Sequence, residues 1–153
     1  ALGLPVYASR DWHPENHISF AERGGPWPPH CVAETRGAAF CDELALPADT
    51  VIISKADSAD ADAYSAFNGT ALADHLRQHG VTRVFVCGLA TDYCVLNTAL
   101  DARSEGFDTV ILPEAMRAVN VQPQDGERAI AQMREAGVTT ATLAELGEVA
   151  AAA

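Results

Sequence analysis

The stretch that decides the fold is RVFVCGLATDYCVLNTALDARSEG, residues 83–106. Its opening apolar run, residues 84–87, predicts a buried strand. A turn of small residues follows, and from Asp92 onward apolar side chains recur at helical spacing until Gly106, a residue typical of helix ends. This pattern places Cys94 in the first turn of a helix that a strand feeds directly.

The start of a helix changes the chemistry of a thiol. Its backbone N–H groups and partial positive charge favour the thiolate, and they can hold the oxyanion that forms on an attacked carbonyl. A buried, unreactive cysteine is the alternative, since cysteine is among the most frequently buried residues. Placement alone does not decide between these two interpretations of Cys94.

The composition excludes several classes of protein. The 153 residues suit one domain, residues 1–153, with a core of useful size. A net charge of −11 argues against nucleic-acid and anionic membrane partners, and no apolar run has the length of a membrane span. The four irregularly spaced cysteines fit free thiols in a reducing cytoplasm, where we expect this protein.

Short apolar runs alternate with helical patterns along the chain. This alternation predicts an α/β fold with a mostly parallel sheet and helices on both faces. The Pro- and Gly-rich segment 11–47 is predicted to be an irregular loop with a functional role. We expect strands at residues 4–9, 51–54, 84–87, 109–112 and 138–142, and helices near 71–79, 92–105, 124–136 and the C-terminal end.

Chemically active side chains follow three of these predicted strands. Asp11 and His13 come after the first, Lys55 comes directly after the second, and Cys94 follows the turn after the third. The carboxyl ends of parallel strands meet at one edge, where ligands bind. We therefore predict one shared pocket in which Lys55 stabilises the thiolate and anionic intermediates. A lysine that only extends to solvent at a sheet edge is the alternative.

The same loop offers a metal site. Asp11 and His13 can face one ion, because residues two apart in an extended segment point the same way. His30, in a proline-rich turn, is a third candidate, and such a set suits zinc, iron or manganese. His17 stays open as a fourth ligand, a supporting group or a packing residue. Trp27 and Tyr64 are candidate walls for a flat ring.

Six segments in order carry a family resemblance: RDWHPENHISF, GGPWPPHC, VIISKA, DAYSAF, GLATDYCV and VNVQPQD. Over about residues 9–143, the chain resembles the nicotinamidase/pyrazinamidase group of isochorismatase-like cysteine hydrolases. The resemblance implies an α/β enzyme that converts nicotinamide, and also pyrazinamide, to the acid and ammonia. It also implies one divalent metal, with zinc expected first and iron or manganese next. Nicotinamide is then the small-molecule partner, and we expect a homo-oligomer.

By position, the resemblance also implies roles for individual residues. Cys94 matches the nucleophile and Lys55 the catalytic lysine, while the backbone N–H groups of Ala90 and Cys94 match the oxyanion hole. The Leu89–Ala90 bond matches a cis peptide. The metal ligands implied are Asp11, His13 and His30, with His17 at a position that some members use, and the substrate-pocket aromatics are Trp27 and Tyr64.

One part of the family pattern has no counterpart here. Members carry a catalytic aspartate at the end of a first strand, in a segment resembling V-V-D-x-Q-x-D-F, and this chain opens where their second strand lies. A strand–helix unit of about 30 residues is therefore expected upstream. Without it, the sheet would expose an edge and the thiol would lack its base. A metal-free hydrolase of the superfamily and a non-catalytic protein that binds a metal and a ring remain the alternatives.

Overall fold

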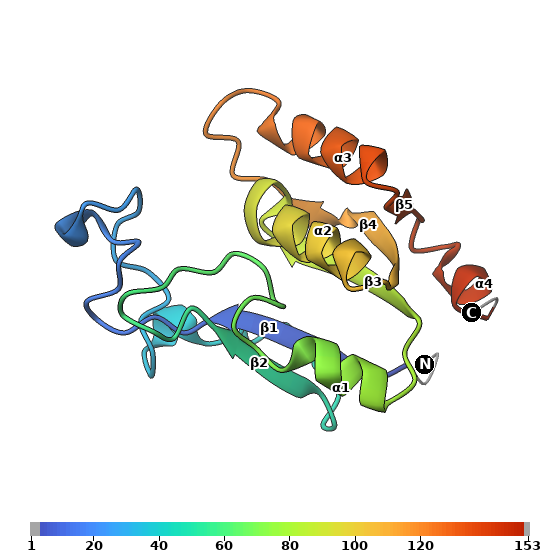
Figure 1. Ribbon diagram of the computed structural model, residues 1–153, viewed down its shortest axis with the longest axis horizontal. Helices are drawn as coiled ribbons and strands as arrows, with labels where there is room; N and C mark the ends of the chain where they lie inside the picture. The colour runs from blue at the N-terminus through green and yellow to red at the C-terminus, as the bar shows by residue number, and fades with distance from the viewer. Residues whose placement is uncertain (1–3, 152–153) are drawn as a thin grey trace. The chain divides into compact units, whose positions relative to one another are not determined.

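The computed structural model, drawn in Figure 1, describes residues 4–151. The outermost residues of the predicted domain, 1–3 and 152–153, lie outside that range. The backbone contacts gather in two compact units, one up to Thr70 and one from Ala71 onward, and each has its own parallel sheet. That residues 1–153 form a single domain stays a prediction. No helix within the described range has the length and apolarity that a bilayer crossing needs.

The sheet of the first unit consists of β1 (Tyr7–Asp11) and β2 (Val51–Lys55), which lie side by side in Figure 1. They pair in parallel, and the register runs to a final pair of Asp11 opposite Lys55. The first strand starts three residues later than predicted, after Pro5, which has no N–H to give to a ladder. Both polar residues therefore lie at the carboxyl end of their strands, as the sequence predicts.

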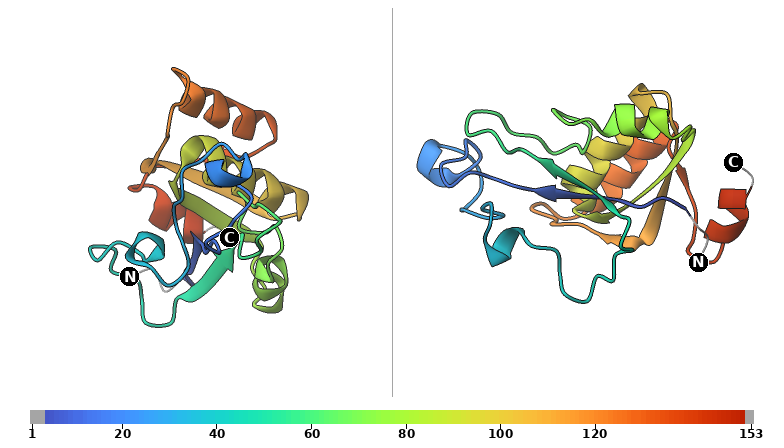
Figure 2. Two further views of the ribbon diagram at one scale, coloured as in Figure 1. Left: turned by 90° about the vertical axis from the view of Figure 1, so that its left-hand side faces the viewer. Right: turned by 90° about the horizontal axis from the view of Figure 1, so that it is seen from below.

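The long segment between these strands is ordered without forming a sheet. It contains two short 3₁₀ turns, η1 (Ala21–Arg23) and η2 (Arg36–Ala38), which the right-hand view in Figure 2 shows beyond the carboxyl end of β1. Two isolated parallel bridges, His13 with Val32 and Phe20 with Trp27, fold the segment onto itself. The predicted irregular loop is therefore a fixed frame for the side chains that it carries.

The second unit has a parallel sheet in the order β3–β4–β5, formed by β3 (Arg83–Leu89), β4 (Asp108–Arg117) and β5 (Thr139–Thr140). Helices cover both of its faces. Val95, Ile111 and Met133 belong to a buried cluster that joins α2 (Leu96–Ser104) and α3 (Asp125–Glu135) to one face. On the other face Leu146 of α4 (Leu146–Ala151) packs on Val110. The predicted α/β class with helices on both faces of a parallel sheet is confirmed.

Three predicted elements differ in detail. The helix at 71–79 is α1 (Leu72–Gln78), close to its expected bounds. The strand expected at 109–112 continues to Arg117, because the pairing with β3 shifts register around Pro113 and then resumes at Met116. The strand expected at 138–142 pairs over only two residues. Helices α2, α3 and the C-terminal helix lie where the periodicity predicts them.

Gly25 is the glycine of the long loop at which we expect a side chain to be least tolerated. A Cβ added there would lie 2.2 Å from the carbonyl carbon and oxygen of Ser19, whereas one added at Gly37 would meet only the Thr35 hydroxyl at 3.6 Å. Gly25→Ala should therefore lower the free energy of unfolding by about 3 kcal/mol. Gly37→Ala, the matched control, should change it by less than about 0.5 kcal/mol in urea unfolding. Equal effects of the two substitutions would contradict the described path of the loop.

Candidate active site and metal centre

Cys94 lies in a wide helical turn, η3 (Thr91–Val95), between β3 and α2. The carbonyl of Ala90 accepts hydrogen bonds from the N–H groups of Tyr93 and Val95, at 3.1 and 3.0 Å, and so closes this turn. The Leu89–Ala90 bond is cis, as the resemblance implies. Turns of the π type recur at functional sites. Cys94 is half-buried.

Asp92 anchors this turn to a distant segment of the chain. Its carboxylate accepts hydrogen bonds from the backbone N–H groups of Val119 and Asn120, at 2.9 and 2.8 Å. The Asn120 side chain accepts in turn from the N–H of Gly126 in α3, at 2.9 Å. The loop that enters α3 is thus tied to the turn that carries the candidate nucleophile. No pattern in the sequence indicates this role of Asp92.

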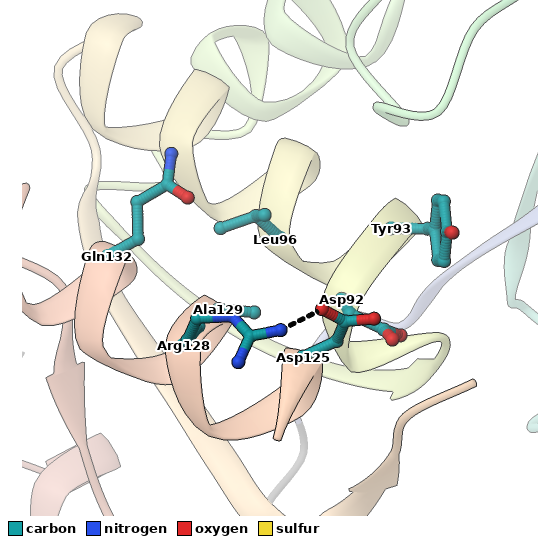
Figure 3. A pocket seen from close by; sticks show the side chains of 7 residues that line it. All are labelled: Asp92, Tyr93, Leu96, Asp125, Arg128, Ala129 and Gln132. Atoms are coloured by element: carbon teal, nitrogen blue, oxygen red, sulfur yellow. Dashed lines mark hydrogen bonds and ion pairs between the residues drawn. The ribbon is translucent and has the colours of Figure 1, made fainter. Parts of the chain in front are cut away.

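A cavity of about 360 Å³ lies beside this turn, between α2 and α3 (Figure 3). Asp92, Tyr93 and Leu96 form one wall, and Asp125 and Arg128, joined by an ion pair, form the other. Cys94 is not among its lining residues. The cavity is therefore bordered by other residues of the same helical segment.

Lys55 is buried, with 3% of its surface exposed. Its ammonium donates one hydrogen bond to the Asp11 carboxylate and a second, of 2.8 Å, to the carbonyl of Ala63. A buried ammonium is costly unless such partners satisfy it. The alternative of a lysine that extends to solvent at the sheet edge is therefore wrong. In the first unit, the structure brings Lys55 and Asp11 together as an ion pair.

Backbone carbonyls fix the tautomers of His13 and His30. The Nδ1 atom of His13 lies 3.0 Å from the carbonyl oxygen of Ala56, and the Nδ1 atom of His30 lies 2.8 Å from that of Pro28. A carbonyl oxygen can only accept, so each Nδ1 carries the hydrogen and each neutral ring keeps its lone pair on Nε2. Burial lowers the pKa of His13 below its ordinary value of 6.5, which also favours the neutral ring.

His17 has both ring nitrogens engaged. Its Nε2 donates to the carbonyl of Ala61 at 3.0 Å, so Nδ1 is the acceptor, and it receives hydrogen bonds from the hydroxyl and the N–H of Ser19. The ring is fully buried and stacks on His13, with centroids 4.1 Å apart. His17 would have to break a hydrogen bond to bind a metal, so its geometry fits a supporting and packing role better.

Phe20 is a packing residue that the sequence analysis did not single out. Its buried ring lies 5.6 to 5.7 Å from the ring centroids of His13, His17 and His30. An apolar ring in this place packs against the three imidazoles without competing for their nitrogens. The sequence signal for this packing role was the phenylalanine that ends the segment RDWHPENHISF.

One group of potential metal ligands is assembled within the described residues. A ligand atom from each of Asp11, His30 and Cys31 lies within 4.8 Å of the other two, and all three residues are half-buried. Oxygen, imidazole and sulfur donors suit a divalent transition metal, zinc among them. The ring centroids of His13 and His30 lie 4.9 Å apart. His13 is not part of the trio whose ligand atoms all lie within 4.8 Å of one another. Cys31 was missed by the sequence analysis.

Trp27 and Tyr64, the candidate walls for a flat ring, contact each other. The indole N–H of Trp27 donates to the Tyr64 hydroxyl at 2.9 Å, and both side chains are half-buried. The Trp27 ring also lies at an edge-on angle to His30, with centroids 6.3 Å apart. The first unit therefore holds the aromatic pair next to one of the candidate metal ligands.

Comparison with known proteins places this geometry in a family. Residues 1–145 match the Isochorismatase domain. The chain is 40% identical over 167 residues to the nicotinamidase of Escherichia coli (strain K12), an alignment that covers 95% of this chain and 78% of that protein.

Two solved structures are similar over most of the chain. The pyrazinamidase of Pyrococcus horikoshii in complex with zinc superposes with a TM-score of 0.87 at 52% identity, over 92% of this chain and 76% of that one. PnC1 from L. infantum in complex with nicotinate superposes with a TM-score of 0.84 at 41% identity. This match covers 90% of this chain and 71% of that one. These findings confirm the resemblance: the chain belongs to the isochorismatase family, within its group of nicotinamidase and pyrazinamidase amide hydrolases.

Proposed function

We propose that this chain hydrolyses nicotinamide, and pyrazinamide as a second substrate, to the carboxylate and ammonia. Curated relatives with nicotinamidase activity in their names support the reaction, and the relative in complex with nicotinate supports the ring as ligand. The observation that carries the proposal is the position of Cys94. It lies half-buried in a π turn that begins after a cis Leu89–Ala90 bond, directly beyond a parallel strand.

The chemistry proposed is acyl transfer through a thioester. The sulfur of Cys94 attacks the amide carbonyl carbon, the C–S bond forms, and the C–N bond breaks as the amine takes a proton and leaves as ammonia. Water then adds to the thioester, which releases the carboxylate and returns the thiol. The N–H groups of Ala90 and Cys94 are proposed to hold the oxyanion in both steps.

Lys55 is proposed as the second catalytic group. Its ammonium is desolvated and held by Asp11 and by the Ala63 carbonyl, so its position is fixed before substrate binds. A preorganised positive charge in a site with little water stabilises developing anions more strongly than a mobile one in solvent. This role follows the family resemblance.

Asp11, His13 and His30 are proposed to bind a divalent metal, with zinc as the first expectation. The Nε2 atoms of both rings and the second oxygen of Asp11 would supply the donors. Such an ion would supply Lewis-acid chemistry to a bound substrate and to water. The zinc in the Pyrococcus horikoshii relative supports this proposal. His17 is left outside the ligand set because both of its nitrogens are engaged.

Cys94→Ala should lower the rate of ammonia release from nicotinamide by at least about 10⁴-fold, since no other group takes the place of the nucleophile. Metal content should stay unchanged, because no proposed ligand is touched. Cys41→Ser, at an exposed cysteine bonded to Glu43, is the matched control and should keep turnover. Substantial ammonia release by Cys94→Ala would remove Cys94 from its role.

Substitution of a proposed ligand should act on the metal itself. His30→Ala and His13→Ala should each reduce zinc affinity by about 100-fold or more, measured by competition with a chromophoric chelator. His79→Ala, at an exposed histidine just after α1, should leave the affinity unchanged. If the two loop variants retain the zinc affinity of the parent protein, the proposed ligand set is wrong even where catalysis is impaired.

The aromatic pair should act on substrate affinity. Trp27→Leu removes a flat ring surface and should raise KM for nicotinamide about tenfold, in line with a loss of roughly 1.4 kcal/mol in stacking. Tyr64→Phe keeps the ring and removes the hydroxyl that accepts the Trp27 hydrogen bond, so its KM should rise less. Steady-state kinetics with unchanged KM in Trp27→Leu would contradict the role of Trp27.

A further inference from the structure

Arg23 fastens the turn η1 to a distant segment of the first unit, residues 59–64. Its guanidinium donates to the carbonyl oxygens of Asn16 and Ala59, both at 3.0 Å, and to the carboxylate of Asp60 at 2.9 Å. A planar guanidinium has five N–H donors, so one arginine can serve three acceptors whose positions differ. The three bonds join parts of the chain up to 37 residues apart, and we call them the Arg23 clasp.

Buried packing does not hold η1 in place. None of its residues, Ala21–Arg23, is buried, and Gly24 ends the turn with a φ of +82°. The hydrogen bond from the N–H of Arg23 to the carbonyl of Phe20, at 2.9 Å, closes the turn but runs within the loop itself. The position of η1 therefore depends on polar contacts such as the Arg23 clasp.

The loop transmits the position of η1 to Trp27. The N–H of Ala21 donates to the carbonyl of Trp27 at 2.7 Å, and the N–H of Trp27 donates to the carbonyl of Ser19 at 3.0 Å. Pro26 and Pro28 flank Trp27, and their rings restrict the φ angles on both sides of it. Because the loop is short and stiff here, a displacement of η1 also displaces the indole ring.

The segment 59–64 is held in place independently of Arg23. The carbonyl of Ala61 accepts a hydrogen bond from the buried ring of His17 at 3.0 Å. The carbonyl of Ala63 accepts from the buried ammonium of Lys55 at 2.8 Å. Buried polar groups give up such bonds only at a large cost in free energy. The segment is therefore the fixed side of the Arg23 clasp, and the loop with η1 is the side that the clasp positions.

The aromatic pair spans these two sides, because Trp27 lies on the loop and Tyr64 on the segment. The indole N–H donates to the Tyr64 hydroxyl at 2.9 Å. Resting on the proposed function above, we propose that Arg23 is a positioning residue for this pair. The Arg23 clasp sets the separation of the two aromatic walls, and with it the affinity for the pyridine ring and the size of ring system that fits. Arg23 acts through the walls and not on the amide.

The Arg23 clasp is exposed, which limits its strength. The side chains of Arg23 and Asp60 are 36% and 80% exposed. Salt screens an ion pair in such a position, and a pair of this kind contributes little by itself. The bonds to the two carbonyl oxygens have neutral acceptors and remain when the charge of Asp60 is removed. We therefore expect loss of the guanidinium to weaken ring binding more than loss of the Asp60 charge.

Binding of nicotinate to the Cys94→Ala protein, measured by calorimetric titration, tests the proposal without relying on turnover. The Kd should rise about five- to tenfold in Cys94→Ala/Arg23→Ala. It should rise only about twofold in Cys94→Ala/Asp60→Asn, which keeps both carbonyl bonds. Arg36→Ala, at an exposed arginine of η2 in the same long loop, is the matched control and should leave the Kd unchanged.

Ring selectivity separates positioning from general support of the fold. Quinoline-3-carboxylate is a nicotinate with a second fused ring. The ratio of its Kd to that of nicotinate should fall at least about threefold in Cys94→Ala/Arg23→Ala, because a released wall admits the larger ring system. With Cys94 intact, Arg23→Ala should raise KM for nicotinamide about five- to tenfold while kcat changes less than about twofold. Zinc affinity should stay unchanged, since no proposed ligand is touched.

Two results would overturn the role of Arg23. One is a nicotinate Kd and a selectivity ratio that Arg23→Ala leaves unchanged. The other is a joint loss of kcat, zinc affinity and melting temperature, which would make Arg23 a structural support of the whole loop. Either leaves the proposed hydrolysis of nicotinamide standing. A zinc-loaded Cys94→Ala protein that binds no nicotinate, together with a parent protein that releases no ammonia, would remove the proposed function and the ring that Arg23 positions.

Discussion

The parallel pairing of β1 with β2 is the constraint on which the first unit depends. Its register ends with Asp11 opposite Lys55, and the two side chains form an ion pair of which the ammonium is buried. A slip of one residue would turn every side chain of one strand to the opposite face. It would also leave a buried ammonium without its carboxylate, a loss worth about 3 to 5 kcal/mol in buried pairs. Register and charge pairing therefore select the same arrangement, and that arrangement places Asp11 at the start of the histidine-bearing loop.

Beyond this pair, the loop orients its imidazoles with backbone carbonyls. His13, His17 and His30 each donate one ring N–H to a carbonyl oxygen, from Ala56, Ala61 and Pro28 respectively. Every residue type has such a carbonyl, so the tautomers do not depend on the side chains at those three positions. The Phe20 ring packs against all three imidazoles. These hydrogen bonds leave Nε2 as the lone-pair nitrogen of His13 and His30, whereas Nε2 of His17 donates to a carbonyl. His13 and His30 are therefore candidate ligands, and His17 is a supporting residue.

The sequence was most informative where local patterns decide the structure. Apolar runs and helix-ending glycines predict the α/β order, and the residues that follow the first two strands predict where Asp11 and Lys55 lie. Hydrogen bonds between distant segments are different, because no periodicity encodes them. The His17 ring donates to the carbonyl of Ala61, 44 positions away, and the Lys55 ammonium pairs with Asp11, also 44 positions away. Cys31 was overlooked because a thiol beside a histidine in a proline-rich turn has no periodic signal of its own.

Asp92 links the turn of Cys94 to Val119 and Asn120, and Asn120 links these in turn to Gly126. At Gly126 a methyl group would lie 2.7 Å from the Cβ of Ala118, so the entrance of α3 is closely packed. A substitution in the loop before α3 would therefore displace the carboxylate that neighbours the nucleophile. Amino-acid differences in a loop that contains no reacting group can thus change the reactivity of the nucleophile. A comparison of related enzymes that considers only their catalytic residues would not reveal such differences.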